Sequence, residues 1–215
     1  MEKLCNKIAG KIAVELNFDR NKTEVIAYGM FALLQMIISV GLVALVSALF
    51  NVLTEALIIS FTVSILRKYS GGAHASSSIS CIFLGTLICI GQAVAVKFLA
   101  NQQVTLNFMI LFGVIIFISS YFIVYKFAPV DSPAKPIKNK DKRKRMKKGS
   151  IITLSVYVVI IIISLSMYYV IRNSNVINYC LSIYIGVLWQ VLTITTYGNA
   201  FVGKLELLFN YILKF

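Results

Sequence analysis

The chain has 215 residues, of which 59% are hydrophobic and 13% are charged, whereas soluble domains carry about a quarter charged residues. This composition excludes an ordinary soluble protein and indicates a polytopic α-helical membrane protein, since apolar runs of about 20 residues cross a bilayer as helices. The formal net charge of +13 would suit a nucleic-acid-binding protein, but the placement of the charges argues against nucleic acid as a partner.

Residues 1–24 mix acidic and basic side chains and contain no uninterrupted apolar core, so a cleavable signal peptide is not expected. Apolar residues recur four apart in this segment, with lysines beside them, which is a helical period. We therefore predict an amphipathic cytoplasmic helix, either lying among lipid headgroups or packing on the transmembrane helices. The repeating residues are Leu4, Ile8, Ile12 and Leu16.

Six apolar segments follow, and each is a candidate transmembrane helix. Their approximate ranges are 27–50, 52–66, 79–96, 104–125, 151–171 and 178–197. Nineteen of the 21 Lys and Arg residues fall in alternate connecting segments, as the positive-inside rule requires. The sequence therefore predicts one all-α membrane domain over residues 1–215, with six transmembrane helices and both termini in the cytoplasm. A second interfacial helix is expected from Asn199 onward.

Polar side chains within the predicted spans are few. Gln35 and Gln190 are amides that need hydrogen-bond partners inside a membrane, and packing is favoured over a catalytic role. With one histidine and no Cys-x-x-Cys pair, we predict no metal site and no cofactor. The cysteines give no disulfide framework; they are Cys5, Cys81, Cys89 and Cys180.

Residues 126–149 are predicted to form a cytoplasmic loop that contains prolines and many basic residues. All three prolines of the chain lie here and exclude a helix where they occur. The run from Lys138 to Lys148 has eight basic residues in eleven positions. Such a run is attracted to anionic lipid by about 1 kcal/mol per basic residue, and binding of an acidic peptide is the weaker alternative.

The segment 67–81 is a polar region between two apolar spans, and it holds the only histidine, His74, seven residues before Cys81. A cysteine attacks as the thiolate, and a histidine can form an ion pair with it or act as its base. Serines at 76–78 are candidate N-caps for the next helix, which would put Cys81 in or near a first turn, where the helix dipole stabilises negative charge.

Spacing sets a condition on this pair. In one straight helix, seven residues separate two side chains by about 10.5 Å along the axis, beyond the roughly 3 Å reach of a hydrogen bond. The chain must therefore turn back between His74 and Cys81, and the glycines Gly71 and Gly72 favour such a turn. The backbone amide of Cys81 and the Gln35 side chain are candidate oxyanion donors. The residues alone leave open the alternative of an interfacial histidine and a space-filling cysteine.

Several motifs combine over essentially the whole chain, and together they resemble the AgrB (accessory gene regulator B) family of Gram-positive quorum-sensing systems. The resemblance includes the length, the six spans, the basic amino-terminal segment and the basic loop. The motif residues are Arg67, Gly71-Gly72-x-His74, Cys81, Pro129-Val130-Asp131 and Lys135-Pro136-Ile137.

This resemblance implies a cysteine endopeptidase of the bacterial plasma membrane, with its active site facing the cytoplasm. His74 would be the base and Cys81 the nucleophile, and Arg67, Gly71 and Gly72 would support them. The substrate would be an AgrD-like propeptide whose carboxy-terminal tail is released through an acyl-enzyme thioester, which allows a thiolactone or lactone ring to close. A homodimer is also implied. Further candidates for substrate binding are Lys135, Lys138 and Asp131.

Two other classes of protein compete with this interpretation. A peptide exporter would place charged residues inside the spans, facing a cavity, and the predicted spans contain essentially none. A purely structural membrane adaptor would use the basic loop but would leave His74 and Cys81 without a task.

Overall fold

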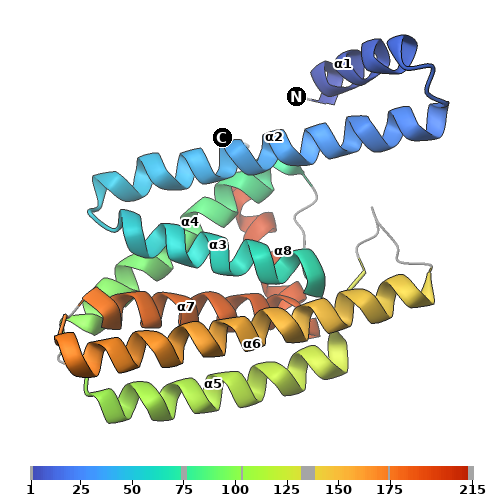
Figure 1. Ribbon diagram of the computed structural model, residues 1–215. Coiled ribbons are helices and arrows are strands. Elements are labelled where there is room, and N and C mark those ends of the chain that lie inside the picture. The colour runs from blue at the N-terminus through green and yellow to red at the C-terminus, as the bar shows by residue number, and fades with distance from the viewer. Residues whose placement is uncertain (1, 74–76, 103, 132–138, 174, 213–215) are drawn as a thin grey trace. The chain divides into compact units, whose positions relative to one another are not determined.

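The computed structural model describes residues 2–73, 77–102, 104–131, 139–173 and 175–212 (Figure 1). Most of these residues are helical, which confirms the predicted all-α class. The chain divides into two compact units, Met1–Leu42 and Val43–Phe215. The helices in chain order are α1 (Glu2–Glu15), α2 (Arg20–Leu49), α3 (Leu53–Ser70), α4 (Ser78–Ala100), α5 (Leu106–Phe127), α6 (Lys140–Ile171), α7 (Asn175–Thr193) and α8 (Thr196–Ile212).

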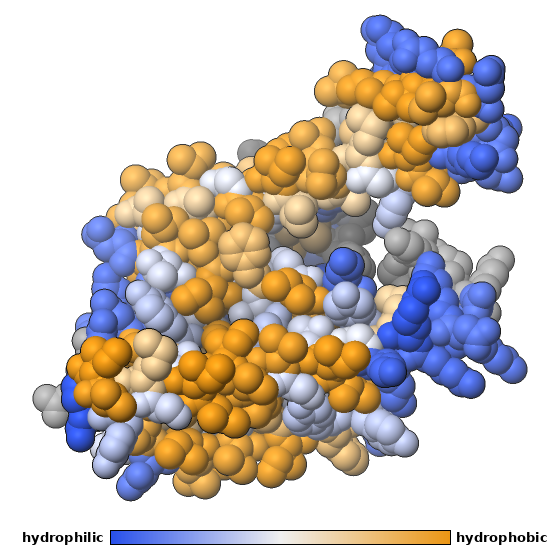
Figure 2. Space-filling view, in the orientation of Figure 1, coloured by the Kyte–Doolittle hydropathy of each residue, from blue (hydrophilic) through white to orange (hydrophobic). Residues whose placement is uncertain are grey.

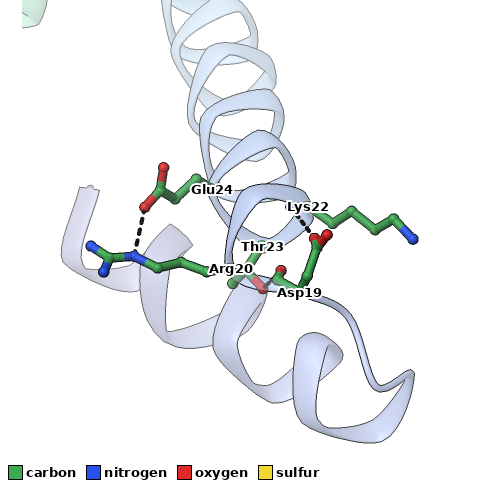
Figure 3. Close-up of polar contacts among 5 residues, drawn as sticks. All are labelled: Asp19, Arg20, Lys22, Thr23 and Glu24. Atoms are coloured by element: carbon green, nitrogen blue, oxygen red, sulfur yellow. Dashed lines mark hydrogen bonds and ion pairs between the residues drawn. The ribbon is translucent and has the colours of Figure 1, made fainter.

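The first unit contains α1 and most of α2, and α1 confirms the predicted amino-terminal helix. Asp19 sets the start of α2, because its carboxylate accepts a hydrogen bond from the Lys22 N–H at 2.8 Å (Figure 3). The Thr23 hydroxyl donates to the Asp19 carbonyl at 2.9 Å. One turn on, the exposed Arg20 and Glu24 form an ion pair at 3.1 Å, which contributes little because both groups are solvated.

The second unit is organised around α7, which packs against α3, α4, α5, α6 and α8. In Figure 1, α3, α7, α6 and α5 lie side by side. Helices in lipid are held by close packing and interhelical hydrogen bonds. Gly186 allows the close approach of α7 to α3, since a Cβ there would lie 3.0 Å from Thr62 Cβ. Buried hydroxyls also join the helices: Tyr157 donates to the Thr62 carbonyl at 3.0 Å, and Tyr184 to the Met109 carbonyl at 3.2 Å.

Within the described residues, five helices are long and apolar enough to cross a membrane: α2, α4, α5, α6 and α7. The predicted span at 52–66 corresponds to α3, which is outside this set because its 18 residues include Glu55, Arg67 and Lys68. Each of the six predicted spans therefore has a helix, while the number of spans and the orientation of the termini stay predictions.

The side chains that α5 and α6 turn outward are largely apolar, as expected for surfaces that meet lipid. Figure 2 shows this hydrophobic surface, with hydrophilic residues gathered toward the helix ends. Exposed examples are Ile110, Leu111, Ile115 and Ile118 on α5 and Ile152, Val159, Ile162 and Ile163 on α6. The composition and this surface together are those of a membrane protein.

The basic segment differs from the predicted loop over 126–149. Lys126 and Phe127 still belong to α5, and α6 begins at Lys140, so the run from 140 to 148 is helical. The reason is that Asn139 is an effective N-cap for α6. Its side chain accepts hydrogen bonds from the Asp141 N–H at 2.8 Å and from the Lys142 N–H at 3.2 Å. Lysine and arginine are also good helix formers.

The carboxy-terminal helix α8 was predicted from Asn199 and begins slightly earlier, at Thr196. It packs against α7 and α4. The rings of Phe83 on α4 and Phe209 on α8 are 6.1 Å apart between centroids. The helix that carries Cys81 is therefore supported by the end of the chain.

Candidate functional site

The glycine pair lies where α3 ends, at the same end of the second unit as the carboxyl ends of α5 and α7 (Figure 1). Gly71 follows the last residue of α3 with φ 69° and ψ −152°, a conformation that favours glycine. The Val130 N–H donates to the Ser70 carbonyl at 2.9 Å, and Gly71 and Val130 form a short parallel β-bridge. A Cβ on Gly71 would overlap the Val130 carbonyl oxygen. The segment after α5 therefore holds one side of the glycine pair.

The other side of the glycine pair is held by the last turn of α7. The Gln190 Nε2 group donates to the Ser70 hydroxyl at 2.9 Å and to the Gly71 carbonyl at 2.7 Å. The Ala73 N–H donates to the Thr193 carbonyl at 3.0 Å. Between these contacts, Gly72 has φ +136°, and a Cβ there would lie 2.9 Å from Thr193 Oγ1.

Arg67 lies in the last turn of α3, beyond its apolar part, and folds back over this segment. Its Nη2 group donates to the Ala73 carbonyl. Desolvation by the surrounding protein lowers the pKa of the Arg67 guanidinium from its usual value, and the neighbouring Cys81 acts in the opposite direction. The structure therefore brings Arg67, the glycine pair and Cys81 together.

Cys81 lies at the end of the first turn of α4. The predicted N-cap is Ser77: its Oγ accepts a hydrogen bond from the Ser80 N–H at 3.0 Å and donates to the Ser80 hydroxyl at 2.8 Å. The Cys81 amide donates to the Ser77 carbonyl at 3.0 Å. This bond corrects the idea that the Cys81 amide serves as an oxyanion donor, because the helix already uses it. The Cys81 side chain is partly exposed, whereas Cys5, Cys89 and Cys180 are buried.

The remaining site predictions have different outcomes. His74 lies outside the described residues, as do Lys135 and Lys138, so the turn between His74 and Cys81 stays a prediction. Asp131 is described, and its carboxylate accepts a hydrogen bond from Arg143 Nη1 at 3.4 Å. The same guanidinium donates through Nη2 to the Pro129 carbonyl at 3.2 Å. Arg143 therefore ties the Pro-Val-Asp motif to α6.

Sequence reasoning missed the partners of the glycine pair. Gln190 stood out as a polar residue in an apolar span, but nothing in the sequence indicated that it contacts Gly71. Thr193 and Val130 act through backbone groups, which leave no side-chain signal. In the parts of the chain that are described, no group of three His, Cys, Asp or Glu side chains is placed to hold a metal ion.

Comparisons with known proteins agree with these motifs. The family described as accessory gene regulator B, AgrB, matches residues 5–194 of the chain. An AgrB-like protein of Clostridium perfringens strain SM101 is 45% identical over 99% of this chain and 100% of its own length, and an AgrB-like protein 2 of strain 13 is 44% identical over the same shares. A Listeria innocua AgrB-like protein is 26% identical over 59% of each chain.

No solved structure matches this chain. The family match covers most of the sequence, and the two clostridial relatives align along its whole length. The chain therefore belongs to the AgrB family, which supports a role in the agr quorum-sensing system.

Proposed function

We propose that this protein is a membrane cysteine endopeptidase that cleaves the carboxy-terminal tail from an AgrD-like propeptide. Cys81 is the nucleophile and His74 the base. The product is an acyl-enzyme thioester that allows a thiolactone or lactone ring to form. The protein acts in the bacterial plasma membrane with Cys81 facing the cytoplasm, and it works as a homodimer.

The observation that carries this proposal is the placement of Cys81. It is the one cysteine of the four that is not buried. It sits in the first turn of α4, where the helix dipole favours negative charge, and beside the Arg67 guanidinium. Nearby cationic groups and helix amino termini are the surroundings in which cysteines act as nucleophiles.

The proposed reaction has two acyl transfers. His74 takes the thiol proton, the Cys81 sulfur attacks the scissile carbonyl, and a carbon–sulfur bond forms as the carbon–nitrogen bond breaks. The proton passes to the leaving amine, and the tail departs. A thiol or hydroxyl of the bound peptide then attacks the thioester, the bond to Cys81 breaks, and the proton returns to the sulfur.

Arg67 and the glycine pair support this chemistry in the proposal. The guanidinium provides a positive charge beside the Cys81 sulfur. Gly71 and Gly72 allow the chain to pass closely between Val130 and Thr193. Lys135, Lys138 and Asp131 are the proposed contacts for the propeptide.

Co-expression with an AgrD-like propeptide tests the proposal. We expect Cys81→Ala and His74→Ala to abolish release of the tail while the protein still inserts into the membrane. Mass spectrometry of the wild-type protein should find the peptide attached to Cys81 as a thioester. Cys180→Ala is the matched control, because Cys180 is fully buried in α7 and has no role in the reaction. Tail release by Cys81→Ala at the wild-type rate would refute the proposal.

A further inference from the structure

We propose that Gln190 of α7 is a positioning residue for the Cys81 site, holding the backbone at Ser70 and Gly71 so that Arg67 stays beside Cys81. This inference rests on the proposed function. It assigns a task to a residue that lies outside the motif of Arg67, Gly71, Gly72, His74 and Cys81.

The burial of Gln190 is the first reason. Its side chain is 0% exposed within α7, a helix that is apolar enough to cross a membrane. A buried amide costs free energy unless its groups are hydrogen-bonded. Its Nε2 group has two acceptors, but among the described residues Oε1 has none. A leucine would fill this space without that cost, so stability alone does not explain the amide.

The partners of Gln190 are the second reason. Its Nε2 group binds the two residues at which α3 gives way to the glycine pair, Ser70 and Gly71. Three residues further along α7, the Thr193 carbonyl accepts the Ala73 N–H, and the Thr193 hydroxyl donates to the Gln190 carbonyl at 2.8 Å. One turn of α7 therefore fixes both ends of the segment from Ser70 to Ala73.

The connection to Cys81 runs through Ala73. The Ala73 carbonyl is the acceptor for the Arg67 guanidinium, and Arg67 in turn lies beside Cys81. Arginine has a long, flexible side chain, so its position depends on the groups that accept its hydrogen bonds. Without Gln190, the segment keeps its bonds to Thr193 and Val130, but the Ser70 hydroxyl and the Gly71 carbonyl lose the Nε2 donor, and the Ala73 carbonyl that Arg67 uses shifts.

The chemical reactivity of Cys81 tests this chain of contacts without using a propeptide. The full-length protein in lipid vesicles is treated with iodoacetamide, and mass spectrometry follows the alkylation of each cysteine. We expect Gln190→Leu to slow alkylation of Cys81 about tenfold at pH 7. In an Arg67→Ala background, Gln190→Leu should change the rate by less than about twofold, because its effect on Cys81 passes through Arg67.

Two controls distinguish a specific effect of Gln190 on the Cys81 site from a general loss of packing in the protein. Gln92→Leu removes another amide with a buried Oε1 that has no partner among the described residues. Gln92 lies on α4, about 16 Å along the helix axis from Cys81, so this change should leave the alkylation of Cys81 unchanged. Cys89 and Cys180 report on packing, because both are buried. In Gln190→Leu their labelling should stay as slow as in the wild type.

The outcomes are distinct. A wild-type rate at Cys81 in Gln190→Leu overturns the inference, as does faster labelling of Cys89 and Cys180. If Gln190→Leu fails to accumulate, Ser70→Ala replaces it: this variant loses one of the two acceptors, so alkylation should slow about twofold, and an unchanged rate overturns the inference. Tail release by Cys81→Ala would refute the proposed function but would leave this measurement intact.

Discussion

Substitution of Gly71 by alanine tests the contact between the glycine pair and the segment after α5. Gly71 has φ +69°, and an added Cβ would overlap the Val130 carbonyl oxygen. That oxygen belongs to the backbone, and Val130 is itself anchored by the hydrogen bond from its N–H to the Ser70 carbonyl. The added methyl group therefore has no flexible neighbour that can yield.

Two energetic costs determine how far Gly71→Ala lowers the free energy of unfolding. Holding a residue other than glycine in this backbone conformation costs about 1–3 kcal/mol. Moving a packed backbone away from the new methyl group costs about 1–3 kcal/mol more. We therefore expect Gly71→Ala to lower the free energy of unfolding by at least about 2 kcal/mol. For a chain of this size, that lowers the thermal midpoint by at least about 4 °C.

Thermal unfolding of the purified protein in detergent measures this loss, and release of the propeptide tail measures its effect on function. Gly85→Ala is the matched control, because Gly85 lies in α4 with nothing within 4 Å of an added Cβ. In that helix interior alanine should stabilise the protein by about 0.5–1 kcal/mol. A midpoint for Gly71→Ala within 1 °C or so of the wild type, together with normal tail release, would refute the reasoning.

Two further substitutions test other contacts. Ser77→Ala removes the N-cap of α4 and should cost about 1 kcal/mol; thermal unfolding measures the loss, and Ser77→Asp, which keeps an acceptor for the Ser80 N–H, should recover most of it. Tyr157→Phe removes the buried hydrogen bond to the Thr62 carbonyl and should lower stability by about 0.6–2 kcal/mol. The same change at Tyr121, whose hydroxyl bonds an exposed Ser155, should cost less, and an equal loss at both tyrosines would contradict this ranking.

Local signals in the sequence were enough to place the helices. Each apolar run became a helix because a chain in lipid must satisfy its backbone hydrogen bonds internally. Several helix starts have side-chain caps: a serine was predicted to begin the helix of Cys81, and Ser77 does so. The basic run was the exception, because the prediction weighed the charge of the run and overlooked Asn139 as a cap.

The supports of the site could not be predicted in the same way. Gln190 is 119 residues from Gly71 in the sequence, and Val130 is about half as far. Their contacts form because the carboxyl ends of α3, α5 and α7 lie at the same end of the second unit. That arrangement is a property of the packed helices and not of any one segment. The contacts also involve backbone carbonyl and amide groups, which every residue carries. The residues with distinctive chemistry could therefore be identified from the sequence, whereas the residues that hold them in place could not.

The Pro-Val-Asp motif gains a physical explanation from these contacts. Asp131 is a proposed contact for the propeptide, and within the structure its carboxylate is paired with Arg143. That ion pair is 49% and 37% exposed at its two side chains, so it is worth at most about 1 kcal/mol. The stronger constraint is the Val130 backbone, which bonds Ser70 and lies against Gly71. The motif therefore supports the glycine pair through the Val130 backbone, while Gln190 bonds the same pair from α7.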